Sequence, residues 1–173
     1  MRYASSFKKF SQGIAQLRAP GHSGFMGSSS SIPVFGVRDD SLPQRTRPCA
    51  YAVVINSQGL IAAVKESAGR IFLPGGGIDP PESPVEAIHR EVREELGCEV
   101  RLGAYIGQAL RHFVSDGQCQ ALYATFYAGE LGERITTDHE HELMWILPDK
   151  LFHPHHKWAV EKHLAAAKNE AHV

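Results

Sequence analysis

The chain has 173 residues and 43% hydrophobic content, which is enough for one well-packed domain and short for two. Its formal net charge of −1 and pI of about 6.8 exclude the basic field on which non-specific nucleic-acid binding depends. The three cysteines, Cys49, Cys98 and Cys119, have neither disulfide-framework nor metal-site spacing, and no apolar run approaches a membrane span of about 18 residues. We therefore expect a cytoplasmic protein in a reducing compartment, with no membrane or nucleic-acid partner.

The N-terminal segment, residues 1–38, contains no Asp or Glu, is rich in Ser and Gly, and carries five Arg or Lys residues. We predict a basic N-terminal extension over residues 1–38, followed by a single domain over residues 39–173. An organelle presequence, a flexible leader and a start codon placed too early all remain open. A short amphipathic helix packing on the domain is a further alternative, because four apolar residues recur at helical spacing: Phe7, Phe10, Ile14 and Leu17.

Residues 50–55 are rich in β-forming residues and lead through a polar turn at 56–59 into residues 60–65. This pattern predicts a β-hairpin. Residues 72–73 are predicted to form a short strand that enters a run of glycines.

A helix is predicted over residues 84–96, with a start signal at its N-terminus and a stop signal at its C-terminus. Ser83 is a good N-cap, Pro84 suits the first helical position, and Glu86 completes a capping box with Ser83. Gly97 can adopt the left-handed conformation that commonly ends a helix. The helix therefore has roughly three and a half turns.

Two sets of side chains share this helix. Val85, Ile88, Val92 and Leu96 form one stripe that we expect to be buried. Three carboxylates occupy a neighbouring sector at i,i+3 and i,i+4 spacing: Glu91, Glu94 and Glu95.

The crowded carboxylates allow two interpretations. Partly desolvated carboxylates about 5 Å apart repel by roughly 3 kcal/mol per pair at an effective dielectric near 20. A bound divalent cation removes this penalty, and Mg²⁺ or Mn²⁺ prefers sites built from oxygen ligands. The alternative is a solvated acidic face that is softened by pairing of Arg90 with Glu86 and Glu94.

The chain beyond the helix is again rich in strand patterns. We predict strands over 100–111, 120–130 and 144–147, a turn at Asp116 and Gly117, and a terminal helix over 156–168 with Trp158 and Leu164 turned inward. Because the order is β-rich, helix, β-rich, helix, without regular βαβ alternation, it predicts an α+β sandwich.

The segment from Gly76 to Cys98, GGIDPPESPVEAIHREVREELGC, resembles the complete signature sequence, or Nudix box, of the Nudix hydrolase family. Every fixed glycine and polar position matches: Gly76, Glu82, Arg90, Glu91, Glu94, Glu95 and Gly97. Cys98 stands where the family usually carries Ile, Leu or Val, and a cysteine behaves there as a small hydrophobe. The resemblance covers roughly residues 47–164. It implies a Nudix-type α/β/α sandwich with a mixed β-sheet, in which the motif forms a loop-helix-loop.

The resemblance also implies a chemistry, which is the metal-dependent hydrolysis of a nucleoside diphosphate linked to another group. The implied metal is Mg²⁺ or Mn²⁺, held by Glu91, Glu94, Glu95 and the carbonyl of Gly75. The implied catalytic residues are Glu91, Glu94 and Arg90. Either Glu91 or Glu94 accepts a proton from the attacking water, and Arg90 holds the glutamates in register. Three residues support the motif: Gly76, Glu82 and Gly97.

The loop at 138–142 supplies a further predicted metal ligand, Glu140, with a solvated polar loop as the alternative. A zinc site is less favoured, because the loop lacks the second histidine of HExxH. The later histidines also lack a thiolate partner: His153, His155 and His156.

For substrate binding we predict Arg47 for phosphates, with Arg45 and Arg111 as further candidates for distal phosphates. Tyr51 and Phe113 are predicted stacking faces, with the hydrophobic core as the alternative place for both aromatic residues. The leading prediction is a pyrophosphohydrolase of nucleoside triphosphates. Nucleotide sugars, dinucleoside polyphosphates and the triphosphate end of RNA remain alternatives, as does a nucleotide-sensing module without catalysis. The oligomeric state is open between monomer and homodimer.

Overall fold

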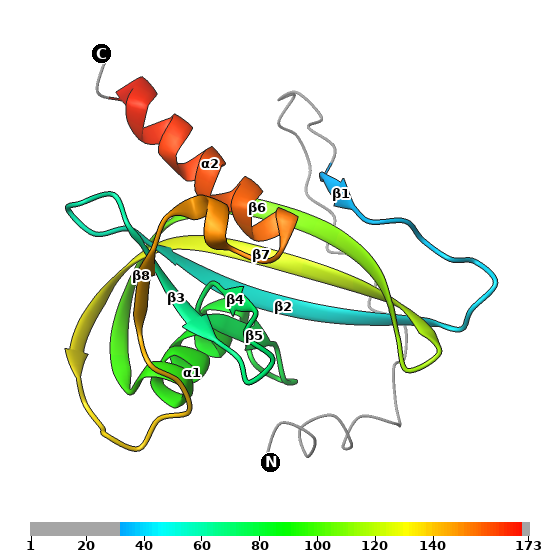
Figure 1. Cartoon of the computed structure of the whole chain (residues 1–173), viewed down its shortest axis with the longest axis horizontal. Coiled ribbons are helices and arrows are strands. Elements are labelled where there is room, and N and C mark those ends of the chain that lie inside the picture. The colour runs from blue at the N-terminus through cyan, green and yellow to red at the C-terminus, as the bar shows by residue number, and fades with distance from the viewer. Residues whose placement is uncertain (1–31, 171–173) are drawn as a thin grey trace. The chain divides into compact units, whose positions relative to one another are not determined.

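The computed structural model describes residues 32–170 (Figure 1). Most of the predicted basic extension and the alternative amphipathic helix at Phe7 to Leu17 lie outside the described residues. Within residues 32–170, no helix has both the length and the apolar character needed to cross a membrane.

The larger sheet is mixed and has five strands in the order β1-β6-β7-β2-β5. Its long strands pair parallel between β2 and β7 and antiparallel between β6 and β7. Asp116 and Gly117 form the predicted turn between β6 and β7 with φ of 52° and 70°, the conformation that a tight hairpin favours. The strands are β1 (Val34–Phe35), β2 (Gln44–Val54), β5 (Gly75–Gly77), β6 (Cys98–Ser115) and β7 (Gln118–Arg134).

A second sheet has three strands in the order β4-β3-β8, which are β4 (Ile71–Phe72), β3 (Ile61–Lys65) and β8 (Met144–Ile146). The predicted hairpin of 50–55 with 60–65 is present only at its turn, where the amide of Asn56 donates to the carbonyl of Leu60 at 2.9 Å and a single antiparallel bridge joins Ile55 to Ile61. Beyond that bridge the prediction is wrong, because β3 pairs with β4 and β8 instead of with β2.

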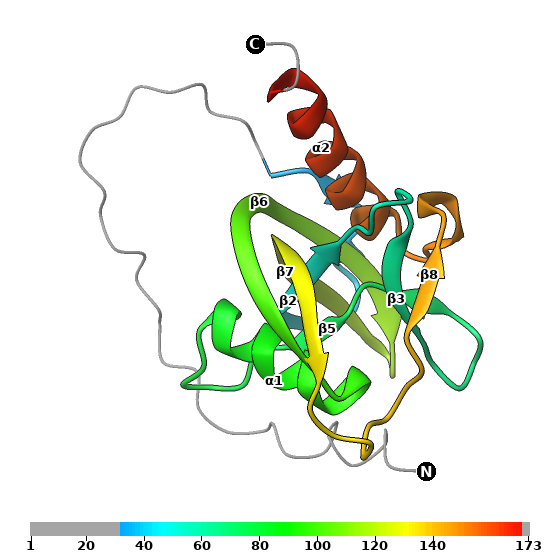
Figure 2. The ribbon, with the colours of Figure 1, turned by 90° about the vertical axis from the view of Figure 1, so that its left-hand side faces the viewer.

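The helices α1 (Pro84–Leu96) and α2 (Pro154–Glu170) cover opposite sides of the larger sheet (Figure 2). A short 3-10 helix, η2 (Pro148–Lys150), precedes α2. Alternate residues of β2 build the two cores: Ala50, Ala52 and Val54 pack with α1, while Cys49, Tyr51 and Val53 pack with α2. Trp158 and Leu164 of α2 are partly buried against the second core. The architecture confirms the predicted α+β sandwich.

The strand β1 was missed by the sequence analysis, since two residues show no periodicity. Val34 and Phe35 pair parallel with Leu110 and Arg111 of β6, although both lie in the segment predicted as an extension. Gly36 follows with φ of 78°, and a Cβ there would stand 2.1 Å from the carbonyl oxygen of His112. The close approach of the backbone therefore requires glycine at this position.

The buried face of α1 differs from the predicted stripe. Ile88, Val92 and Leu96 are fully buried, but Val85 is 36% exposed, so its predicted burial is wrong. Glu95 is only 5% exposed. The helix is thus rotated so that its glutamate side turns toward the sheet, which leaves Val85 at the margin of the contact.

Candidate active site

Both ends of α1 are fixed by the predicted caps. The amide of Glu86 donates to the hydroxyl of Ser83 at 3.3 Å, and the amide of Ser83 donates to the Glu86 carboxylate at 2.7 Å. At the other end Gly97 has φ of 65°, and its amide donates to the carbonyl of Arg93 at 2.9 Å. These caps fix the start and the end of the helix that carries Glu91, Glu94 and Glu95.

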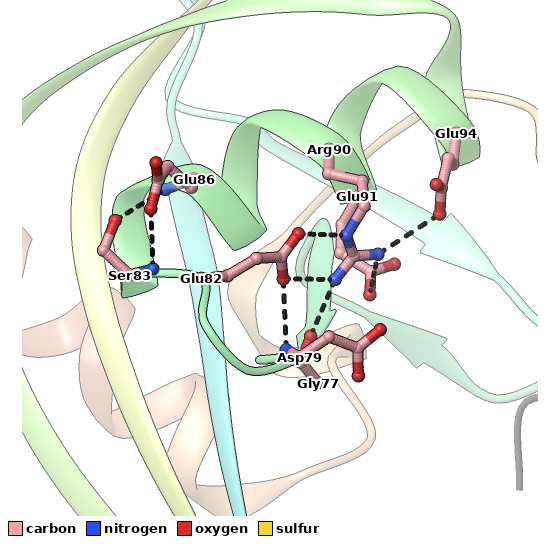
Figure 3. Close-up of polar contacts among 8 residues, drawn as sticks. All are labelled: Gly77, Asp79, Glu82, Ser83, Glu86, Arg90, Glu91 and Glu94. Atoms are coloured by element: carbon pink, nitrogen blue, oxygen red, sulfur yellow. Dashed lines mark hydrogen bonds and ion pairs between the residues drawn. The ribbon is translucent and has the colours of Figure 1, made fainter. Parts of the chain in front are cut away.

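Arg90 is the centre of a hydrogen-bond network that joins α1 to the glycine strand β5 (Figure 3). Its guanidinium donates to both carboxylate oxygens of Glu82, at 2.6 and 3.0 Å, and to the carbonyl of Gly77 at 2.9 Å. It also donates to Glu91 at 2.9 Å and to Glu94 at 3.3 Å. The hydrogen bonds from Arg90 lower the pKa of Glu82.

Glu82 also closes the loop that precedes α1. The amide of Asp79 donates to the Glu82 carboxylate at 3.1 Å, and the same carboxylate accepts hydrogen bonds from Arg90 (Figure 3). The loop and the helix are therefore braced through one carboxylate.

Glu95 is a buried carboxylate next to the glycine strand. It accepts a hydrogen bond from the amide of Gly75 at 2.9 Å, and burial raises its pKa well above the usual value. Three further carboxylates add to that rise: Glu91, Glu140 and Glu94. Burial also raises the pKa of Glu91, although Arg90 opposes this effect. The α1 face therefore holds carboxyl groups whose ionisation a nearby cation would favour.

The glycines of β5 allow the backbone to lie against these side chains. A Cβ on Gly76 would stand 2.7 Å from a carboxylate oxygen of Glu91, and one on Gly77 would stand 2.8 Å from the guanidinium of Arg47. Gly75 has φ of 130°, and its Cβ would stand 2.3 Å from the carbonyl of Ala50. Any larger residue would displace the groups of the site.

The loop with Glu140 reaches the site through its backbone, which the sequence alone gave no means to predict. The amide of Glu140 donates to the carbonyl of Glu94 at 2.9 Å, and that of His141 donates to the carbonyl of Glu95 at 2.8 Å. These bonds satisfy carbonyls that the end of a helix leaves unpaired. They also bring the exposed side chain of Glu140 into electrostatic range of Glu95.

The donor set suits a hard divalent cation, because it consists of carboxylate and carbonyl oxygens. Among residues 32–170, however, no three His, Cys, Asp or Glu side chains are already grouped to hold a metal ion. Arg90 instead occupies the space between Glu91 and Glu94. Each of these two carboxylates contacts Arg90 through one oxygen, so an ion held here would bind through the other oxygen.

The three predicted substrate residues lie in different surroundings. Arg47 lies against Gly77 and opposes the rise that burial causes in the pKa of Glu91, so it lies near the glutamates of α1. Tyr51 is 9% exposed and stacks on Phe126 at 5.7 Å between ring centroids. It therefore lies in the hydrophobic core, the place that the sequence analysis gave as the alternative to substrate binding. Phe113 is partly buried, and the guanidinium of Arg111 lies 4.4 Å from its ring centre.

Three histidines at the start of α2 form a buried group that we call the histidine cluster: His153, His155 and His156. His155 and His156 have no exposed surface, and the ring centroids within the cluster are 4.4 to 5.5 Å apart. Burial lowers the pKa of His153 and His155 to about 3. The sequence analysis did not predict this cluster, although the absence of Asp and Glu from residues 150–160 is a signal that these histidines have no acidic neighbour in the sequence.

Comparison with known proteins identifies the class of this fold and site. The NUDIX domain model matches residues 45–167, so the chain belongs to the Nudix hydrolase family. Members of this family generally require divalent metal ions, and the chain is a Nudix pyrophosphohydrolase.

Individual relatives support the same family. The chain is 33% identical over 105 residues to a candidate 8-oxo-dGTP diphosphatase of Bacillus subtilis, a match that covers 59% of this chain and 67% of the relative. It is 32% identical to the CTP pyrophosphohydrolase of Escherichia coli, over 57% of this chain and 75% of the relative. A Nudix hydrolase of Nitrosomonas europaea has a similar fold, with a TM-score of 0.58 at 18% identity, covering 70% of this chain and 90% of that one.

Proposed function

We propose that the protein is a Mg²⁺-dependent pyrophosphohydrolase that cleaves nucleoside triphosphates. The observation that carries the proposal is the group of desolvated carboxylates on α1, Glu91 and Glu95 above all, held beside a glycine strand whose backbone lies close against them. The relatives named 8-oxo-dGTP diphosphatase and CTP pyrophosphohydrolase support the choice of substrate.

In this proposal Glu91, Glu94, Glu95, Glu140 and the carbonyl of Gly75 hold the ion. A divalent cation bound there lowers the pKa of a water molecule and neutralises charge on the phosphates. Mg²⁺ is favoured over softer metals because every proposed ligand atom is oxygen, and Mn²⁺ shares that preference.

The residues of the chain supply position and a proton acceptor. Glu91 or Glu94 accepts the proton that leaves the attacking water. Arg90 fixes the rotamers of both carboxylates through its bonds to Glu82 and Gly77, since phosphoryl transfer depends more on positioning than on covalent help. Arg47, which lies beside Gly77, binds the phosphate chain.

The proposal is tested by separating and quantifying the nucleotide products over a panel of nucleotides by ion-exchange chromatography, with either Mg²⁺ or EDTA. We expect nucleoside monophosphate from nucleoside triphosphates with Mg²⁺ and no product with EDTA. The same panel includes 8-oxo-dGTP, CTP, a nucleotide sugar, a dinucleoside polyphosphate and 5′-triphosphorylated RNA. If the nucleotide sugar, the dinucleoside polyphosphate or the RNA is hydrolysed faster than every nucleoside triphosphate, the proposed substrate class is contradicted.

A separate outcome bears on the enzymatic class itself. Tight binding of nucleotides without hydrolysis across the whole panel would indicate a sensing module. A Glu94→Gln variant serves as the catalytic control, because it removes one negative charge while keeping the size of the side chain. Turnover unchanged in this variant would contradict the proposed role of Glu94.

A further inference from the structure

Arg111 of β6 is a partly buried cation without an acidic partner. Arg90 pairs with Glu82 and Arg70 with Glu66, but none of the carboxylates among residues 32–170 forms an ion pair with Arg111. Burial lowers the pKa of Arg111, which shows that its surroundings disfavour the charge. A desolvated guanidinium of this kind is stabilised most by an anion.

The two neighbours of Arg111 orient it and leave donors unused. Its guanidinium lies 4.4 Å from the ring centre of Phe113, a cation–π contact, and its Nη1 is 3.3 Å from Nε2 of His153. A guanidinium can only donate, so Nε2 of His153 accepts, and the neutral ring carries its proton on Nδ1. That Nδ1 is buried and has no hydrogen-bond partner within the described part of the chain.

The surroundings of this pair are electropositive. Arg70 lies close enough to lower the pKa of both Arg111 and His153. His153 directly precedes α2, a helix of 17 residues whose N-terminal end carries partial positive charge. His155, which follows within that first turn, is fully buried, and neither of its ring nitrogens has a partner among residues 32–170.

The register of the sheet connects this pair to the α1 site. Arg111 lies opposite Leu122 of β7, and Leu122 lies opposite Arg47 of β2. Two strand spacings separate the two arginines, which is about 10 Å between their backbones. Arg47 in turn touches Gly77 beside the glutamates. The two arginines are therefore close enough for one nucleotide to contact both.

We propose that Arg111 and His153 form a second anion site that binds a phosphate of the substrate remote from the diphosphate that is cleaved. The guanidinium offers a planar fork of donors to phosphate oxygens, and His153 positions that fork through its Nε2. This inference rests on the proposed function for its substrate, but the anion site itself does not depend on catalysis. Nucleoside triphosphates that carry an additional phosphate on the ribose fit such a site.

The first experiment measures binding of inorganic phosphate by calorimetry in EDTA, where the α1 carboxylates hold no ion and repel the anion. We expect wild-type protein and the Glu94→Gln variant to bind phosphate equally. Arg111→Met should weaken binding at least about tenfold, which corresponds to about 1.4 kcal/mol. Arg101→Met is the matched control, because Arg101 lies on the same strand, is largely exposed and pairs with Glu130. Thermal melting of each variant shows whether it is folded.

The second experiment compares a nucleoside triphosphate with its 3′-phosphorylated counterpart. We expect the extra phosphate to lower KM in wild-type protein and to have no such effect in Arg111→Met, with similar kcat in both. Arg111→Lys, which keeps the charge and loses the planar fork, should retain part of the effect. This variant also tests the proposal if Arg111→Met does not fold.

The outcomes separate the two proposals. Phosphate binding that Arg111→Met abolishes supports the anion site even if no nucleotide is hydrolysed, and in that case only the proposed function fails. Phosphate binding that is absent in wild-type protein, or unchanged in Arg111→Met, overturns the anion site. A loss of discrimination between guanine and other bases in Arg111→Met, without any loss of phosphate binding, also overturns it and assigns the residue to the base.

Discussion

The α1 side and the α2 side of the larger sheet both bury ionisable groups, with opposite results. On the α1 side, burial raises the pKa of Glu91 and Glu95. On the α2 side, it lowers the pKa of His153 and His155 to about 3. Burial disfavours the charged form in each case. The carboxylates, however, have Arg90 and the proposed cation as counter-charges, whereas the histidines stay neutral. The same desolvation penalty therefore favours binding of a cation on the α1 side, and on the α2 side it keeps the histidines uncharged.

The largest expected effect comes from neutralising a carboxylate on the α1 side. We expect Glu94→Gln and Glu95→Gln each to lower kcat by about 10²-fold or more, because several kcal/mol of charge stabilisation is lost. Steady-state hydrolysis of the best nucleotide in Mg²⁺ measures this.

The matched control is Glu99→Gln, in which the lost carboxylate pairs with Arg93 away from the glycine strand. It should retain activity within about twofold, given that exposed ion pairs contribute little. Equal losses in the control and in Glu94→Gln would show that the effect is not local to the site.

Acid should destabilise the α2 side. The pKa of His153 and His155 is lowered from 6.5 to about 3 on folding, so below pH 6.5 the unfolded chain binds protons that the folded protein does not. Burial of the neutral histidines therefore costs no free energy of unfolding above pH 6.5, and it lowers the free energy of unfolding progressively as the pH falls from 6.5 toward 3. We expect Tm to be roughly 5 to 10 °C lower at pH 5 than at pH 7.5.

Variants assign this acid sensitivity to the histidine cluster. His155→Phe should flatten the dependence of Tm on pH, since the ring is fully buried and lies among aromatic neighbours. His89→Asn on α1 is the control and should leave the slope unchanged. A slope that persists in full in His155→Phe would contradict the assignment.

Local features explain what could be predicted from the sequence. The capping box of Ser83 and Glu86, the Gly97 terminus and the Asp116–Gly117 turn each depend on neighbouring residues, and each is present in the structure. The burial of Glu95 depends instead on how α1 is rotated against β2. A sequence pattern of apolar residues pointed to Val85 as part of that face and was wrong.

Other features depend on contacts far apart in the chain. The separation of β3 from β2 depends on β8, a strand about 80 residues further along the chain with which β3 pairs. The approach of Glu140 to the site follows from backbone bonds to the end of α1. Arg111 meets His153 across 42 residues, and no short motif signals that contact.

A smaller effect is expected from Arg90→Lys. Lysine keeps the charge but cannot reproduce the two bonds to Glu82 together with those to Gly77 and Glu91. We expect the Mg²⁺ concentration for half-maximal activity to rise about 10- to 100-fold, as for residues that orient metal ligands. A Mg²⁺ titration of activity measures this, and a fall in kcat without any change in Mg²⁺ dependence would contradict the positioning role.

The smallest effect should come from Gly76→Ala. The new Cβ would stand 2.7 Å from the Glu91 carboxylate, which must shift, but that group is the end of a flexible side chain. We expect a loss of activity of about tenfold or less with little change in Tm. Gly103→Ala is the control, because its nearest neighbour would be a carbonyl at 3.8 Å. Equal activity of the two variants would show that Glu91 tolerates the displacement.

The central claim is that the desolvated carboxylates of α1 bind a divalent cation, and calorimetric titration of the substrate-free protein with Mg²⁺ at pH 6 and pH 8 tests it most directly. Because the raised pKa of Glu95 makes protons compete with the ion, the account predicts binding at millimolar or lower Mg²⁺ that is tighter at pH 8 and is lost in Glu95→Gln. No binding at either pH, or equal binding in Glu95→Gln, would contradict it.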